Sequence, residues 1–364
     1  MPDEFLAWLD RDTSMLADPV TYNDAVVRYF RTTYAEHLVR VFSELESRAA
    51  SPYAPWLQRA LAVVPRRALE RHLFALFSAA TSSGGVTEQH IRFGSAFLRG
   101  ISIPVMQIDH MLDRLHLAAG TESEATGLTS PIWLGSICLL HEGLRDMLNL
   151  PHAKELLKVV LSDYLRVYSS LETEMKGRYK DYGLLHPTEY LNWMLHSYDS
   201  SLTCRYFSVT VQGAILINQG AVSPTVKKLA HLFGRLRQLV DQIADVEEDV
   251  LIGKLTVPVL HALTKCPLLQ EEIRDLWRES QGCSLDTELL QPRLNRIHKL
   301  VLENNGFEYS SGLALSCYEE AMALFHNEPL LPDLGIEIRI LFRLKRAFLE
   351  RLKRNGWRDI PGYY

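Results

Sequence analysis

Apolar residues recur every three or four positions over long stretches of this chain. Between residues 224 and 243 the recurring residues are Leu229, Leu232, Leu236, Leu239, Val240 and Ile243. This spacing is typical of a helix that buries one face. The same period returns at residues 313–324 and 338–348, whereas few segments show the two-residue alternation of a strand. We therefore predict an all-α chain.

Prolines are expected to divide these helices, because proline lacks a backbone N–H and clashes with the preceding turn. The proline-free intervals are each long enough for one or two helices: residues 65–104, 104–131, 151–187, 187–224 and 292–329. The composition, with 47% apolar and 23% charged among 364 residues, is enough to bury a large core. No repeat, low-complexity linker or sharp change in composition divides the chain. We expect residues 51–364 to form one antiparallel helical bundle, preceded by an N-terminal helical annex at residues 1–50.

Charge and cysteine usage exclude several classes of protein. The 39 basic and 44 acidic residues give a net charge of −5 without a basic stripe, so nucleic acid is not an expected partner. The five cysteines are scattered and never in C-x-x-C spacing, which argues against a disulfide scaffold or a thiolate zinc site. The N-terminus lacks the basic patch of a signal peptide, and no segment reaches about 18 uninterrupted apolar residues. The chain is therefore expected to be cytoplasmic and without a membrane span.

Two aspartates lie one helical turn apart in an otherwise apolar stretch, GISIPVMQIDHMLDRLHLAAG (residues 100–120). Asp109 and Asp113 are spaced i, i+4, so on a helix both carboxylates leave the same face. Like charges in this spacing destabilise a helix by a few tenths of a kcal/mol, and burying either one without a partner costs much more. A cation bound between them would offset the repulsion.

A second cluster places Asp241, Asp245 and Asp249 at successive four-residue steps in RQLVDQIADVEEDVLIGKLTVP (residues 237–258). Their apolar neighbours predict that this face borders the interior. Carboxylate oxygens suit Mg²⁺, which commonly adds waters and substrate phosphates, and the following Lys254 could contact the same phosphates. A lone Asp-x-x-x-Asp pair is more simply a solvated, salt-bridged helix face. Two such clusters, one of them followed by Gly-Lys-x-Thr-x-Pro, favour a metal site.

These motifs resemble those of the trans-isoprenyl diphosphate synthase superfamily, whose fold is shared by class I terpene synthases. Residues 109–113 (DHMLD) match its first motif, Asp-Asp-x-x-Asp. Residues 238–245 (QLVDQIAD), followed by residues 253–258 (GKLTVP), match its second motif and are the more specific match. The resemblance covers roughly residues 90–350. It implies an all-α bundle around a central cavity, and it suggests a homodimer.

The activity that the resemblance implies is Mg²⁺-dependent ionisation of an allylic prenyl diphosphate, with the metals binding the diphosphate leaving group. It assigns the metal ions to Asp109, Asp113, Asp241 and Asp245. It assigns the diphosphate to Lys254, Gln238 and Arg205, although Arg205 could equally form a surface ion pair. Candidates for the prenyl pocket are Val105, Phe97, Trp193 and Tyr198. Aromatic π faces stabilise a cation, but aromatic residues at helical spacing are more often part of a core.

Departures from the family pattern refine this prediction. His110 and Gln242 replace the middle aspartates, and Ala118-Ala119 stands where the family carries two arginines that bind isopentenyl diphosphate. Alanine cannot supply such charge-assisted contacts. The leading interpretation is a terpene synthase (cyclase) on a prenyl synthase-like scaffold. The alternatives are a prenyltransferase with another acceptor, a chain-elongating isoprenyl diphosphate synthase, and a non-catalytic partner subunit. The retained aspartates argue against the non-catalytic subunit.

The length of the prenyl substrate is predicted from the residues before the first motif. In the family, bulky residues about one turn earlier close the bottom of the prenyl pocket. Here those positions are the compact residues Pro104 and Val105. A C15 or C20 allylic diphosphate is therefore the expected substrate.

Overall fold

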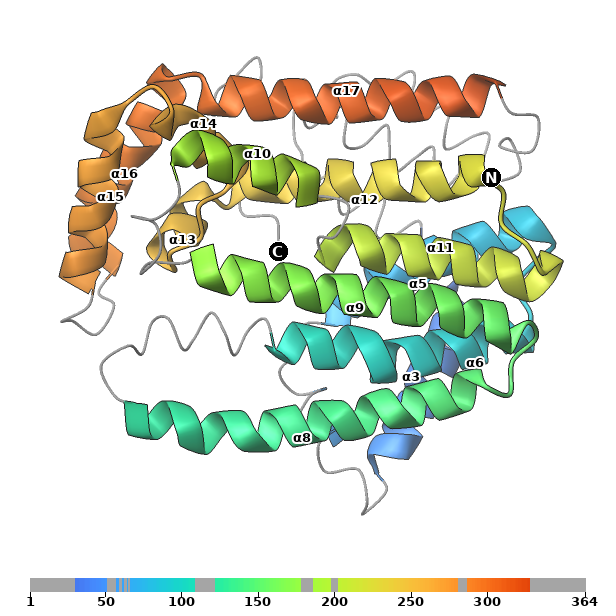
Figure 1. Ribbon diagram of the computed structural model, residues 1–364. Coiled ribbons are helices and arrows are strands. Elements are labelled where there is room, and N and C mark those ends of the chain that lie inside the picture. Colours follow the sequence, from blue (N-terminus) through green and yellow to red (C-terminus); the bar gives the residue numbers. More distant parts are fainter. Residues whose placement is uncertain are drawn as a thin grey trace.

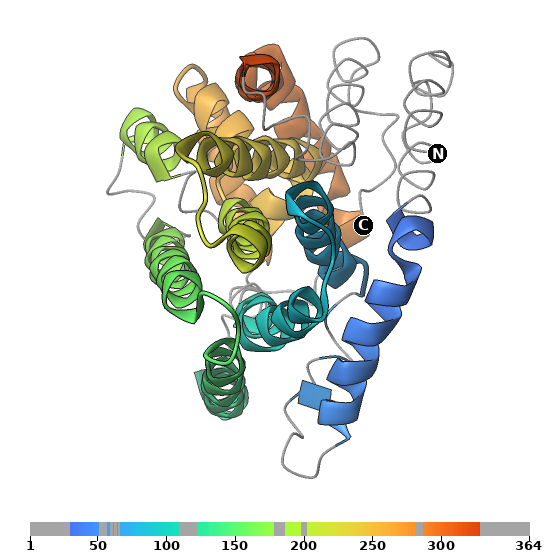
Figure 2. The same cartoon turned by 90° about the vertical axis from the view of Figure 1, so that its right-hand side faces the viewer.

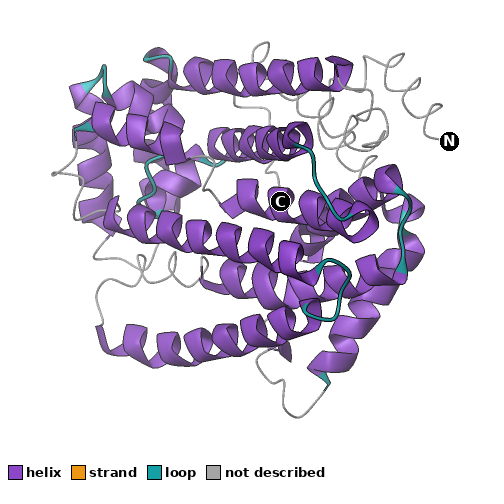
Figure 3. Ribbon diagram, turned by 45° about the vertical axis from the view of Figure 1, so that its right-hand side comes forward, coloured by secondary structure: helices purple, strands orange, loops and turns teal. Residues whose placement is uncertain are grey.

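The computed structural model describes residues 30–50, 57–58, 61, 64, 66–108, 122–177, 186–197, 202–280 and 287–327. Every regular element among these residues is a helix (Figure 3). In chain order they are α3 (Ala35–Ala49), α5 (Arg66–Ser83), α6 (Glu88–Phe97), the π-helix η2 (Leu98–Ser102), α8 (Glu122–Met147), α9 (Ala153–Gly177), α10 (Pro187–Ser197), α11 (Leu202–Gln219), α12 (Pro224–Ala244), α13 (Val246–Leu251), α14 (Val257–Leu263), α15 (Pro267–Ser280), α16 (Thr287–Glu303) and α17 (Gly306–Asn327). None of these described helices combines the length and apolar character needed to cross a membrane. The all-α prediction is confirmed.

The long helices lie side by side in a bundle with α11 near its centre (Figures 1 and 2). α11 packs against α5, α6, α9 and α12, and α12 packs in turn against α17. Short connections at residues 148–152 and 220–223 join α8 to α9 and α11 to α12, so these neighbours run antiparallel. The helices α15 and α16 pack on each other at one end and run across the long helices (Figure 1). This architecture confirms the predicted antiparallel bundle.

Two of the helices predicted from periodicity are confirmed. The stripe of α12 is buried at Leu229, Leu236 and Leu239, and the stripe in residues 313–324 belongs to α17. The helix predicted at residues 338–348 lies outside the described residues.

The N-terminal helix α3 joins the same hydrophobic core as the rest of the bundle. It packs against α6, and its residues Leu38, Val41 and Leu45 are buried in that core. A separate annex ending at residue 50 stays a prediction.

Two prolines that were expected to end helices lie inside them. α8 continues through Pro131 and α16 through Pro292. A proline removes one backbone hydrogen bond but leaves the turns on either side intact, so a long, packed helix can continue through it.

Pro104 has a local effect on the helix that contains it. It has no N–H for the carbonyl of Gly100, and the backbone just before it is widened into the π-helix η2.

The helices η2 and α8 meet at a pair of glycines. A Cβ added at Gly143 would lie 2.6 Å from the Cα of Gly100 and 2.7 Å from the carbonyl oxygen of Ala96. Both neighbouring atoms belong to the backbone, so they could move aside only if the helices separated. The two glycines therefore set how closely the segment that precedes the first aspartate motif approaches α8.

Gly143→Ala is expected to lower the free energy of unfolding by about 1–3 kcal/mol, the usual cost of forcing extra volume into a packed contact. Gly312→Ala on α17 is the matched control, because nothing lies within 4 Å of a Cβ added there. Alanine should stabilise that helix by roughly 0.5–1 kcal/mol. Urea unfolding followed by circular dichroism measures both variants. Wild-type stability in Gly143→Ala would contradict the close backbone contact.

Candidate functional site

The C-terminal part of α12 carries the second aspartate motif. At the start of this helix the Ser223 hydroxyl accepts a hydrogen bond from the Val226 amide at 3.2 Å, and Pro224 occupies the first turn. Further along, Leu236 and Leu239 are fully buried. Packing against α11 and α17 fixes the helix, so the polar side chains near its end project from a rigid support.

Asp241, Asp245 and Asp249 follow one helical path across the junction of α12 and α13. α12 ends at Ala244 and α13 begins at Val246. Backbone hydrogen bonds continue through the junction: the Asp245 amide donates to the Asp241 carbonyl at 3.0 Å, and the Asp249 amide donates to the Asp245 carbonyl at 2.8 Å. The three aspartates are partly buried. They therefore do not lie on a freely solvated face.

The loop after α13 folds back toward α12. Gly253 has a φ of +84°, a conformation that favours glycine, and the next amide, that of Lys254, donates to the Asp249 carbonyl at 2.6 Å. The Gln242 side chain accepts a hydrogen bond from the Val257 amide at 3.4 Å, which ties the start of α14 to α12. Gln242 thus has a structural role, and the loop holds the backbone of Lys254 against that of Asp249.

Gln238 precedes Asp241 by three residues and so shares its helix face. Its Oε1 atom is buried and accepts no hydrogen bond from the described part of the chain. Leaving such an oxygen unsatisfied costs roughly 1–3 kcal/mol, which a bound cation or a water would offset. Because Mg²⁺ prefers oxygen ligands, this face of Gln238, Asp241 and Asp245 fits a Mg²⁺ ion.

The acids of the second motif do not complete a metal site by themselves. Among the described residues, no three His, Cys, Asp or Glu side chains are grouped so that they could hold a metal ion. Asp109 and Asp113, which are predicted to share the ions, lie outside the described residues. Their approach to Asp241 stays a prediction.

Arg237 belongs to this site and was missed by the sequence reasoning. Its Nε atom lies 3.6 Å from Oδ2 of Asp241, and its guanidinium lies over the Phe207 ring, 5.3 Å from the ring centroid. The Arg237 side chain is 17% exposed and that of Asp241 is 29% exposed, so the pair is partly screened from water. The i, i+4 spacing of Arg237 and Asp241 is visible in the sequence, but the ring contact with α11 is not.

A buried polar cluster lies close to Arg237. His72 on α5 is buried, its Nδ1 lies 2.9 Å from the Ser102 hydroxyl, and its ring packs on Tyr206 with centroids 4.6 Å apart. Burial lowers the pKa of His72 to about 3, and repulsion from Arg237 and Arg71 acts in the same direction. His72 is therefore neutral near pH 7, so Arg237 faces an uncharged neighbour.

The residues predicted to contact the prenyl chain lie in different parts of the bundle. Val105 and Phe97 are fully buried in the core, and the Phe97 ring packs among the aromatic rings of α5, α6 and α11. Arg205 lies on α11 and Trp193 on α10, but only their backbone is described, and Tyr198 lies outside the described residues. Their contacts with a substrate stay predictions.

Comparison with known proteins gives no match to a family model and no match to a curated protein. Solved structures match the fold over most of the chain. A polyprenyl synthase from Roseobacter denitrificans is 16% identical, with a TM-score of 0.61 over 90% of this chain and 99% of that chain. A polyprenyl synthase from Caulobacter crescentus CB15, complexed with calcium and isoprenyl diphosphate, is 14% identical, with a TM-score of 0.65 over 88% of this chain and 97% of that chain.

A geranylgeranyl pyrophosphate synthase from Corynebacterium glutamicum, also complexed with calcium and isoprenyl diphosphate, is 16% identical. Its TM-score is 0.64 over 88% of this chain and 96% of that chain. Sequence identities this low show a common fold rather than a common activity. The chain therefore has the fold of the polyprenyl and geranylgeranyl diphosphate synthases.

Proposed function

We propose that this protein catalyses the Mg²⁺-dependent ionisation of an allylic prenyl diphosphate with release of diphosphate. The observation that carries the proposal is the partly buried, oxygen-rich face of Gln238, Asp241 and Asp245 on a chain with the prenyl synthase fold. Two solved structures with this fold are complexed with calcium and isoprenyl diphosphate, which supports a divalent metal here. Asp109 and Asp113 would complete the set of metal ligands.

The residues of the site have separate tasks in this proposal. When bound, Mg²⁺ supplies positive charge to the diphosphate oxygens as the carbon–oxygen bond breaks. Asp241 and Asp245 would hold the ions, and Lys254, whose backbone is bonded to that of Asp249, would add a cation. Arg237 positions the Asp241 carboxylate through their ion pair. Buried apolar side chains of α6 and α11 exclude water, which would otherwise capture the allylic cation.

The fate of that cation distinguishes the candidate activities. Ala118-Ala119 leaves no arginine pair to bind isopentenyl diphosphate. Losing two charge-assisted contacts of about 1.5–3 kcal/mol each weakens binding roughly 10²–10⁴-fold. Capture by the substrate's own double bonds then becomes the available reaction, which is that of a terpene synthase. The names of the similar structures favour chain elongation as the second candidate, and prenyl transfer to another acceptor uses the same ionisation step.

Product analysis tests the proposal. The protein is given C10, C15 and C20 allylic diphosphates with Mg²⁺, with and without radiolabelled isopentenyl diphosphate, and an EDTA sample serves as the control. We expect diphosphate release from the C15 or C20 substrate and terpene products that carry no label. Efficient incorporation of label into longer prenyl diphosphates would assign chain elongation instead. If none of the three substrates released diphosphate, the proposed ionisation would be wrong.

Val105→Phe tests the predicted depth of the prenyl pocket. Val105 is fully buried and lies four residues before Asp109. A phenyl ring there should shorten the accepted chain and shift the substrate preference from C20 toward C10. Because overpacking costs about 1–3 kcal/mol, a thermal melt must show that the variant is folded. Val105→Ile adds only one methylene and is the matched control. An unchanged chain-length preference in folded Val105→Phe would remove Val105 from the pocket.

A further inference from the structure

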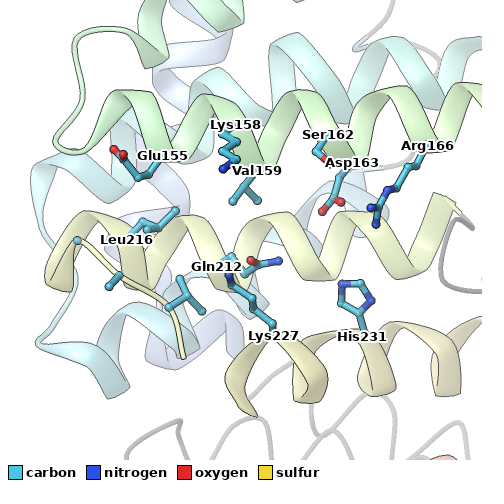
Figure 4. Close-up of a pocket in the computed structure, with 13 residues that line it drawn as sticks. Glu155, Lys158, Val159, Ser162, Asp163, Arg166, Gln212, Leu216, Lys227 and His231 are labelled. Carbon is cyan, nitrogen blue, oxygen red and sulfur yellow. The ribbon is translucent and has the colours of Figure 1, made fainter. Parts of the chain in front are cut away.

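A groove of about 540 Å³ lies between α9, α11 and the N-terminal part of α12 (Figure 4). It is distant from the proposed diphosphate site, because its residues Lys227 and His231 precede Asp241 by fourteen and ten positions on α12. At 1.5 Å per residue these separations are about 21 Å and 15 Å along the helix axis. A smaller groove of about 350 Å³ shares Lys227 and His231 and extends toward Arg235. The two grooves therefore form one concave region at the N-terminal part of α12.

Three basic side chains line the larger groove: Lys158 and Arg166 from α9, and Lys227 from α12. All three are exposed, and none forms an ion pair within the part of the chain that the structure describes. Figure 4 shows Lys158 and Lys227 extending into the groove from opposite walls, with Gln212 between the walls. Unpaired cations that converge on one cavity repel one another, so an anion bound between them is stabilised.

Two carboxylates also line the groove, but they do not cancel these charges. Glu155 stands at one end of the groove in Figure 4, apart from Lys227. Asp163 lies on α9 beside Arg166 in Figure 4 and is only 6% exposed. Three basic side chains outnumber the two acids, and of the acids only Glu155 is exposed. The exposed part of the lining therefore carries three basic side chains and one acid.

The rest of the lining limits the kind of anion. The Gln212 amide nitrogen donates to the Ser208 hydroxyl at 2.7 Å and has a second N–H with which to bind a ligand. Apolar surface comes from Val159, Leu216 and Val222. Cavities of about 300–1,000 Å³ are of the size that holds small organic ligands. The lining thus combines an anion-binding part with an apolar wall.

We propose that this groove binds a small soluble phosphate monoester. Its phosphate would lie between Lys158 and Lys227, whose ammonium groups are compact donors suited to phosphate oxygens. Its organic part would lie against the apolar wall. This site is separate from the reaction proposed above and does not depend on it.

Isothermal titration calorimetry with butyl phosphate tests the inference, in EDTA so that no metal bridges the ligand to the aspartates. Inorganic phosphate and butylamine are the comparison ligands. We expect butyl phosphate to bind more tightly than inorganic phosphate, and butylamine not to bind. Lys158→Gln and Lys227→Gln should each weaken butyl phosphate binding roughly tenfold or more, the effect of losing one charge-assisted contact.

Lys265→Gln is the matched control, because Lys265 is exposed after α14 and does not line either groove. The affinity of Lys265→Gln for butyl phosphate should equal that of wild type. Asp241→Asn should also bind butyl phosphate with wild-type affinity, because the groove is distinct from the proposed diphosphate site. Failure of wild type to bind butyl phosphate would overturn the inference, as would equal weakening in Lys265→Gln. The protein is also mixed with vesicles of phosphatidylcholine and phosphatidic acid. If it bound these vesicles but not butyl phosphate, the groove would be assigned to a lipid headgroup, and the inference of a soluble ligand would be overturned.

Discussion

Asp241→Asn is expected to slow diphosphate release from an allylic prenyl diphosphate by roughly 10²–10³-fold, the usual effect of removing one preorganised charge-stabilising group. Asparagine keeps the shape and one oxygen of aspartate but loses the charge that holds Mg²⁺. Folding should be nearly unaffected. The Asp241–Arg237 pair at 3.6 Å is an i, i+4 pair worth at most about 0.5 kcal/mol, and the substitution relieves repulsion with Asp245.

Glu248→Gln is the matched control for this variant. Glu248 is an exposed acid on α13, so its substitution removes the same charge from the same region without touching α12. Colorimetric assay of released diphosphate gives the rates, and calorimetry of Mg²⁺-dependent diphosphate binding gives a readout that does not require turnover. Asp109→Asn should behave like Asp241→Asn. A wild-type rate in Asp241→Asn, or an equal loss in Glu248→Gln, would reject the assignment of the metal to this face.

The helices that are easiest to predict are those whose burial repeats along the sequence. In α12, Leu229, Leu236 and Leu239 report the buried face directly, because each turn of the helix meets the same neighbours. Asp241, Asp245 and Lys254 lie within fourteen residues of one another in the sequence. Their presence in one local segment could therefore be predicted. Short-range hydrogen bonds at the end of α13 then hold the backbone of Lys254 against that of Asp249.

Contacts between distant segments leave no such periodic signal. The stacking of Arg237 on Phe207 joins α12 to α11, and the charge of Arg237 acts on His72 of α5. The cationic groove is assembled from residues 155–166, 212–222 and 227–231. Taken by itself, the sequence of each segment predicts only an amphipathic helix or a turn. Their convergence depends on how α9, α11 and α12 cross, which the sequence pattern does not specify.

Arg99 illustrates both cases. A single charge among the apolar residues of η2 and its flanks is visible in the sequence and indicates a buried ion pair. Its partner Asp146 lies on α8, 47 residues away. Only the close approach of Gly100 to Gly143 brings the two helices near enough for the pair to form. The sequence shows the lone charge of Arg99, whereas its partner Asp146 is identified only by the fold.

Asp146→Asn is expected to lower the free energy of unfolding by about 1–3 kcal/mol, because it removes the ionised partner of a buried guanidinium. Arg99 is fully buried and pairs with Asp146, while Glu142 lies further away at 3.8 Å. The Nε and Nη1 atoms of Arg99 make no hydrogen bond within the described part of the chain. Burial lowers the pKa of Arg99, but a guanidinium stays protonated in proteins. The variant would therefore hold a buried positive charge with its nearest counter-charge removed.

The double variant Arg99→Met/Asp146→Asn shows whether the stranded charge is the cause. It removes both ions and should be more stable than Asp146→Asn alone, even though Asp146 also pairs with Arg48 of α3 at 2.9 Å. Glu320→Gln is the matched control, because it breaks the exposed Lys228–Glu320 pair and should cost less than about 1 kcal/mol. Urea unfolding followed by circular dichroism ranks the three variants. Equal stability of Asp146→Asn and Glu320→Gln would mean that water reaches Arg99, and that the glycine contact alone holds η2 against α8. A larger loss in Asp146→Asn, recovered in the double variant, would mean that a buried ion pair fixes the helix leading into the first aspartate motif.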